Sequence, residues 1–186
     1  MRLYVGNNGS YRVPTAMRQP ANSVVVAREV GFPVLALLAI VVSLDARMPL
    51  GLPGHRGLVW LTLLVAVAMV TRTRPTVIAV GAGSTFAALM LHAGPGGHAS
   101  LRYLAAAVLL YVVAGAPIVR ERRWLLAFAA APIHLVALVG IQVWAGMAEK
   151  VLFHLGFGLV AGLLGWAIAT GIDWGAPPLA PAPRKE

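Results

Sequence analysis

Six apolar runs, separated by short polar breaks, make up most of the chain. They extend over residues 24–44, 58–70, 76–91, 101–117, 124–145 and 151–172. The first break, residues 45–57, combines prolines and glycines that end helices with three basic side chains. A helix needs about 20 predominantly apolar residues to cross the hydrocarbon core of a bilayer. The pattern therefore predicts an all-α polytopic membrane protein, with a six-helix transmembrane domain at residues 23–172.

The two ends of the chain have a different composition. Residues 1–22 mix arginines with asparagine, glycine and proline, and they contain no continuous apolar core, so we expect a polar tail and no signal peptide. Residues 173–186 are rich in proline and alanine and end in basic side chains, a composition typical of a disordered tail.

Composition supports a membrane location. Of the 186 residues, 59% are hydrophobic and only 11% are charged, whereas soluble domains carry about 25% charged residues. The net charge of +9 would suit nucleic acid, but the arginines are scattered between apolar runs, so orientation of the chain in a lipid bilayer explains them better than nucleic-acid binding. The chain has no cysteine, which excludes thiolate nucleophiles and cysteine metal sites.

The basic residues also predict an orientation. If six helices alternate, eleven of the 15 lysines and arginines lie on one side, and four lie on the other: Arg47, Arg56, Arg102 and Lys150. Because cytoplasmic loops carry the excess of positive charge, we expect both termini in the cytoplasm of a multi-pass plasma-membrane protein.

This topology gathers polar side chains at the outer face, which we take as the candidate substrate site. The members are Arg47, His55, Arg56, Trp60, His92, His98, Arg102, Trp144, Glu149 and His154. The arginines, with Lys150, can hold a carboxylate or phosphate through charge-assisted hydrogen bonds. The imidazoles and Glu149 can instead coordinate a transition metal, but no HxH or HExxH spacing occurs. We favour an anionic or mixed-polarity organic ligand, against the alternative of solvated interface residues.

His134 stands apart from this set. It lies within the fifth apolar run, near the middle of the predicted span. Ionisable residues inside a membrane usually face a cavity or a partner. A neutral imidazole bonded to a backbone carbonyl is the simpler alternative.

Catalysis finds little support in the sequence. There is no glycine-rich phosphate loop, so we expect no ATP hydrolysis by this chain, and we expect neither a cofactor nor a bound metal. Gly83-Ser84 resembles part of the GxSG motif of rhomboid-type intramembrane proteases, but Thr85 stands where the second glycine belongs. An intramembrane hydrolase using Ser84 and His154 is therefore the least favoured function.

Small residues mark surfaces where helices can approach closely. Gly158 and Gly162 form a GxxxG on the last run, and Ala36, Ala39 and Ser43 lie on the first. These positions suit packing within the chain. They also suit docking of a second membrane protein on the first helix, as in a membrane scaffold or assembly protein.

The whole pattern resembles the substrate-binding S components of energy-coupling factor (ECF) transporters. The likeness covers residues 24–172: six short helices, a Pro/Gly turn before the second helix, and a last helix rich in His and Gly, FHLGFGLVAGLLGW. It implies a vitamin-like substrate bound from outside, with a transmembrane coupling subunit and separate ATPases as partners. The family docks its coupling subunit through an AxxxA-like motif, to which Ala39-xxx-Ser43, flanked by Ala36, is the nearest match. The chain begins Met1-Arg2 rather than Met-His, which argues against the nickel/cobalt members.

Overall fold

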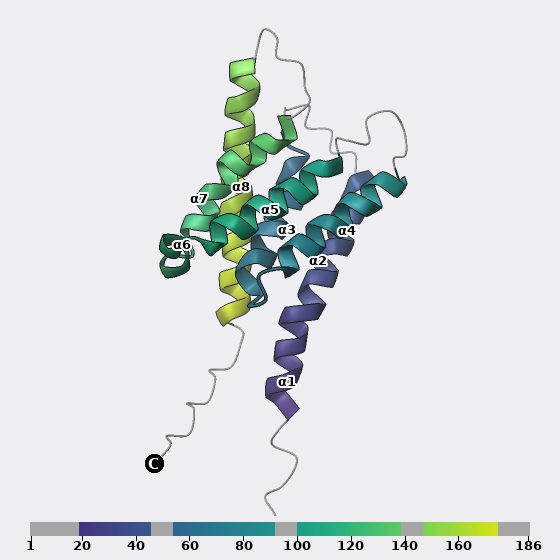
Figure 1. Cartoon of the computed structure of the whole chain (residues 1–186), viewed down its shortest axis with the longest axis vertical. Coiled ribbons are helices and arrows are strands. Elements are labelled where there is room, and N and C mark those ends of the chain that lie inside the picture. Colours follow the sequence, from purple (N-terminus) through teal and green to yellow (C-terminus); the bar gives the residue numbers. More distant parts are fainter. Residues whose placement is uncertain (1–18, 46–53, 92–99, 139–146, 175–186) are drawn as a thin grey trace, which may run out of the picture.

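The computed structural model describes residues 19–45, 54–91, 100–138 and 147–174, and these ranges form helices and turns without a strand (Figure 1). The all-α prediction is therefore confirmed for this part of the chain. The helices are α1 (Gln19–Val26), the π-helical turn η2 (Ala27–Gly31), α2 (Phe32–Asp45), α3 (Gly57–Val70), α4 (Thr76–Leu91), α5 (Leu101–Gly115), α6 (Pro117–Glu121), α7 (Leu125–Ile133), the 3-10 helix η4 (His134–Leu138) and α8 (Met147–Trp174).

Helix α3 forms the centre of the bundle. Ten of its 14 residues are buried. It packs most extensively against α8 and also contacts α2, α4, α5 and α7. A helix that is apolar on every side has to be enclosed by other helices or by lipid, and here neighbouring helices enclose it.

The outer helices carry large apolar side chains on their exposed faces. They include Leu35 and Val42 on α2, Phe86 on α4, Val112 on α5 and Leu152 on α8. Exposed apolar side chains on several helices suit contact with lipid.

Two helical segments are long and apolar enough to cross a membrane, Ser23–Leu44 with 22 residues and Met147–Asp173 with 27. The other four apolar helices have 14 to 16 residues, about 21–24 Å at 1.5 Å per residue. They are shorter than the hydrocarbon core of about 30 Å. A crossing by each of these four stays a prediction.

Prolines explain where the helices depart from the apolar runs. Ala116 is extended, with ψ 135°, because the residue before a proline avoids helical backbone, so Pro117 separates α5 from α6. Pro132 lies inside α7, and the chain tightens into η4 two residues later. The π turn η2 lies next to Pro33, whose nitrogen cannot donate to the carbonyl of Glu29.

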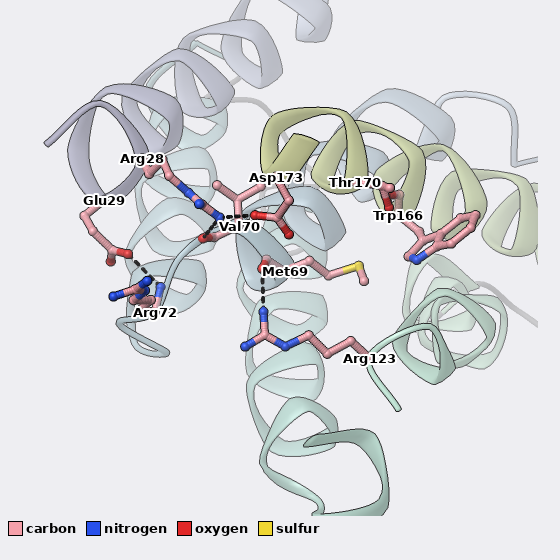
Figure 2. A network of polar contacts seen from close by, with 9 residues as sticks. All are labelled: Arg28, Glu29, Met69, Val70, Arg72, Arg123, Trp166, Thr170 and Asp173. Carbon is pink, nitrogen blue, oxygen red and sulfur yellow. Dashed lines mark hydrogen bonds and ion pairs between the residues drawn. The ribbon is translucent and has the colours of Figure 1, made fainter. Parts of the chain in front are cut away.

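A polar network joins three helices at the end of the bundle where α3 finishes (Figure 2). Arg28 forms an ion pair with Asp173 of α8 and donates to the carbonyl of Val70 at 3.5 Å. The carboxylate of Glu29 accepts the backbone N–H groups of Arg72 and Thr73 at 2.8 and 3.2 Å. Cations near a helix C-terminus are stabilising, so Arg28 supports the end of α3.

Three glycines of α8 allow it to lie against its neighbours. A Cβ at Gly158 would lie 2.8 Å from the carbonyl oxygen of Ala130, and one at Gly162 would lie 1.9 Å from that of Ala127, both on α7. A Cβ at Gly165 would lie 2.8 Å from the carbonyl oxygen of Thr62 on α3. The glycines of the GxxxG motif therefore pack within the chain.

Thr85 connects α4 to the first turn of α5. Its buried hydroxyl donates to the carbonyl of Ser100 at 3.2 Å and accepts the N–H of Leu104 at 3.1 Å. We expect Thr85→Val to lower the free energy of unfolding by about 1–2 kcal/mol, because the isosteric side chain removes two buried hydrogen bonds. Thermal unfolding of the detergent-solubilised chain measures the effect. Thr170→Val is the control, since that hydroxyl bonds only to Trp166 of its own helix. An equal loss in both variants would contradict the assignment.

Candidate functional site

A cavity of about 310 Å³ lies at the end of the bundle where α3 begins. Four parts of the chain form its walls: the turn and first residues of α3, the start of α5, the end of α7 with η4, and the first turns of α8. The lining residues are Gly54, His55, Arg56, Gly57, Trp60, Arg102, His134, Ala137, Leu138, Lys150 and His154.

The structure brings half of the predicted site residues to this cavity: His55, Arg56, Trp60, Arg102 and His154. Lys150, which the topology placed on the same side, joins them. Glu149 is exposed and is not among the lining residues. The other four, Arg47, His92, His98 and Trp144, lie outside the described residues.

His134 also lines the cavity, although the sequence placed it apart from the outer cluster. Its side chain is fully buried, and its Nδ1 donates to the carbonyl of His154 at 2.8 Å. Its ring lies edge-on to that of Trp60, with 5.8 Å between centroids. The signal for its role was present in the sequence, as an imidazole within an apolar run, two residues after a proline that ends regular helix.

Two glycines make room for the imidazoles. A Cβ at Gly57 would lie 1.7 Å from Nε2 of His134, so only glycine fits against that ring. Gly54 has a positive φ of 87°, which other residues rarely adopt, and it lies against the ring of His154. These glycines, predicted only as helix breakers, therefore shape the cavity wall.

The two imidazoles present hydrogen-bond acceptors. Nδ1 of His154 donates to the carbonyl of Lys150 at 2.8 Å, as Nδ1 of His134 does to that of His154. A carbonyl can only accept, so in a neutral ring the proton lies on Nδ1 and Nε2 carries the lone pair. Nε2 of His134 is buried and has no hydrogen-bond partner among the described residues.

Among the described residues of the cavity wall, the cations have no carboxylate beside them. Arg56, Arg102 and Lys150 supply positive charge, and none of the described lining residues is acidic. Arg102 donates from Nη2 to the hydroxyl of Tyr103 at 2.9 Å, while its buried Nε has no hydrogen-bond partner within the described ranges. Trp60 lies edge-on to Tyr103, 5.4 Å between centroids, and provides an apolar wall. The arrangement suits an anionic group held by charge-assisted hydrogen bonds.

The geometry gives less support to a metal site or to a hydrolase. Within the ranges that the structure covers, no three His, Asp or Glu side chains converge as metal ligands, whereas zinc sites use at least three. Ser84 is fully buried on α4, its hydroxyl donates to the carbonyl of Val80, and it does not line the cavity. Within the described part of the chain, no basic side chain bonds to its hydroxyl to activate it as a nucleophile.

The predicted docking residues occupy different environments along α2. Ala36 is 2% exposed and belongs to the core. Ala39 is exposed, and Ser43 is half-buried, with its hydroxyl bonded to the carbonyl of Ile40. The three residues therefore do not all face outward.

The cavity thus combines cations, imidazole acceptors and an aromatic wall from four parts of the chain. Comparison with models of known protein families, with curated proteins and with solved structures finds no match.

Proposed function

We propose that the chain is the substrate-binding membrane subunit of an ECF-type uptake transporter, and that its cavity binds a small, vitamin-like organic anion. The observation that carries the proposal is the composition of the cavity wall, in which Arg56, Arg102 and Lys150 lie beside His154 and Trp60 while none of the described lining residues is acidic. Cations without a carboxylate beside them are suited to hold an anion through charge-assisted hydrogen bonds.

The lining side chains specify complementary ligand groups. The guanidinium and ammonium groups are donors and need an acceptor, such as a carboxylate oxygen. Nε2 of a neutral His154, whose Nδ1 donates to the carbonyl of Lys150, is an acceptor and takes an N–H or O–H donor. A ligand that satisfies both carries an acidic group and a separate donor, which is the mixed polarity that the sequence favoured.

Size and wall chemistry support a small organic molecule. The cavity of about 310 Å³ is near the lower end of ligand pockets, which span roughly 300–1,000 Å³. Trp60 offers an aromatic face for a ring or an alkyl group.

The predicted orientation of the chain in the membrane supports a role in substrate uptake. The cavity lies where α3 begins, and the basic side chains Arg72, Arg74, Arg120 and Arg123 lie where α3 ends. The positive-inside rule puts that basic end in the cytoplasm and the cavity outside. The sequence has no phosphate loop, so the energy for transport would come from separate ATPases through a coupling subunit.

The test begins with mass spectrometry of small molecules that co-purify with the detergent-solubilised chain, followed by calorimetric binding of the molecule identified. Arg102→Met is expected to weaken binding about 10–100-fold, because hydrogen bonds to a charged group contribute about 1.5–3 kcal/mol. Arg122→Gln, exposed and outside the cavity lining, is the control and should bind like the unmodified chain.

Two results would overturn the proposal. One is the absence of any small molecule that binds the chain, and the other is equal affinity of the Arg102→Met variant. Capture of another helix bundle that is insensitive to substitutions in the cavity would favour a scaffold or assembly protein instead.

A further inference from the structure

A second cavity, of about 330 Å³, lies at the other end of α3, about 20 Å along the helix axis from the first at 1.5 Å per residue. The end of α3, the turn that follows it, the end of α5, α6 and the start of α7 form its walls. The lining residues are Ala68, Met69, Thr71, Arg72, Arg74, Ala114, Val119, Arg120, Arg123 and Leu126. Figure 2 shows Met69, Arg72 and Arg123 from this region.

Four arginines, all with exposed side chains, therefore line one cavity, although like charges repel. None of the four forms an ion pair within the part of the chain that the structure describes. Only Arg123 makes a side-chain hydrogen bond there, to the carbonyl of Met69 at 3.5 Å.

The nearby acidic residues offset only part of the positive charge of the cavity. Both carboxylate oxygens of Glu29 accept hydrogen bonds from the backbone N–H groups of Arg72 and Thr73, and its charge also attracts Arg72. Asp173 pairs with Arg28. Glu121 is exposed and is not among the lining residues. A group of arginines with this excess of positive charge is suited to an anion.

The remaining wall is apolar. Ala68, Met69, Ala114, Val119 and Leu126 line the same cavity as the arginines. Basic pockets between helices on the cytoplasmic side of membrane proteins recognise the headgroups of anionic lipids. Guanidinium groups bind the oxygen atoms of a phosphate through bidentate hydrogen bonds. The apolar wall suits the carbon atoms attached to a phosphodiester.

We propose that this cavity binds a phosphate group through Arg72, Arg74, Arg120 and Arg123. The group comes either from an anionic lipid headgroup or from free phosphate, and the chemistry of recognition is the same for both. The site is separate from the cavity of the proposed substrate, so each can be tested without the other.

The test uses the full chain in detergent. Thermal stability is titrated with phosphatidylglycerol, with phosphatidylcholine, and with inorganic phosphate against chloride at equal ionic strength. Arg74→Gln and Arg120→Gln are compared with Arg122→Gln, which makes the same change of charge two residues from Arg120 but outside the cavity lining. Circular dichroism and gel filtration confirm that each variant is folded.

Phosphatidylglycerol should stabilise the unmodified chain at lower concentration than phosphatidylcholine. Arg74→Gln and Arg120→Gln should each weaken that effect about fivefold, the contribution expected of one basic residue at an anionic surface, and Arg122→Gln should leave it unchanged. If inorganic phosphate stabilises the chain, and Arg74→Gln and Arg120→Gln but not Arg122→Gln weaken that effect, the site is supported with free phosphate as its ligand. Equal weakening by all three variants, or no preference for phosphate-bearing anions over chloride and phosphatidylcholine, would overturn it.

Discussion

Gly162→Ala is expected to lower the free energy of unfolding by about 1–3 kcal/mol, the range found when an extra methyl group is forced into a packed interior. The added Cβ would lie 1.9 Å from the carbonyl oxygen of Ala127 and 2.8 Å from its carbonyl carbon. Both are backbone atoms of α7, so no side-chain rotation relieves the contact. The two helices would have to separate, although Ala127 and Ala130 between them are fully buried.

Thermal unfolding in detergent measures this effect, and α8 supplies its own controls. A Cβ at Gly156 or Gly171 meets no atom within 4 Å. Alanine at those positions should stabilise the chain slightly, because glycine in a helix interior is about 1 kcal/mol less favourable than alanine. If Gly162→Ala unfolds at the same temperature as Gly156→Ala, the close approach of α7 and α8 is wrong.

Gly57→Ala is expected to have a comparable effect and also to alter the candidate site. Its Cβ would lie 1.7 Å from Nε2 and 2.5 Å from Cε1 of His134. The imidazole must then move, which breaks the hydrogen bond between His134 and the carbonyl of His154. Overpacking costs about 1–3 kcal/mol, and helix propensity alone would predict the opposite sign.

A double-mutant cycle separates this cause from others. His134→Ala removes the ring that the new Cβ would strike, so Gly57→Ala should cost much less stability when His134 is already alanine. Thermal unfolding of the two single variants and the double variant gives the coupling. Strictly additive losses would show that Gly57 does not face His134.

Several helices were predictable because breakers flank their apolar runs. The run at residues 58–70 became Gly57–Val70, and the run at 76–91 became Thr76–Leu91. A polar turn that contains Arg72 and Arg74 separates the two helices, and Pro75 directly precedes the second one. Helix boundaries were harder to predict in the runs at 101–117 and 124–145. Pro117 ends the first of these runs and Pro132 lies inside the second, and each proline interrupts the regular helix.

The site was predicted in part. In an antiparallel bundle, every second loop lies at the same end. His55, Arg102 and His154 lie in or next to such loops, so they could be grouped from topology alone. His134 was placed near mid-membrane because the whole run 124–145 was taken as one long helix. In the structure α-helix ends at Ile133, and η4 brings His134 to the cavity.

Local sequence does not name the partner of a close contact. Gly57 is a glycine because of His134 of η4, 77 residues along the chain, and Gly162 because of Ala127 of α7, 35 residues away. The arginines around the second cavity were visible as markers of orientation. Their convergence depends on the break at Pro117, which directs α6 back beside the end of α3.

The enclosure of α3 also has a consequence for how the protein is made. Its most extensive packing partner is α8, which is synthesised after the other described helices. Until α8 emerges from the ribosome, the side of α3 that carries Thr62 and Val65 lacks the glycine surface of Gly165 that covers it. The middle of the bundle is therefore completed only after the other described helices have been synthesised, and until then the incomplete chain must keep an exposed apolar helix away from incorrect partners.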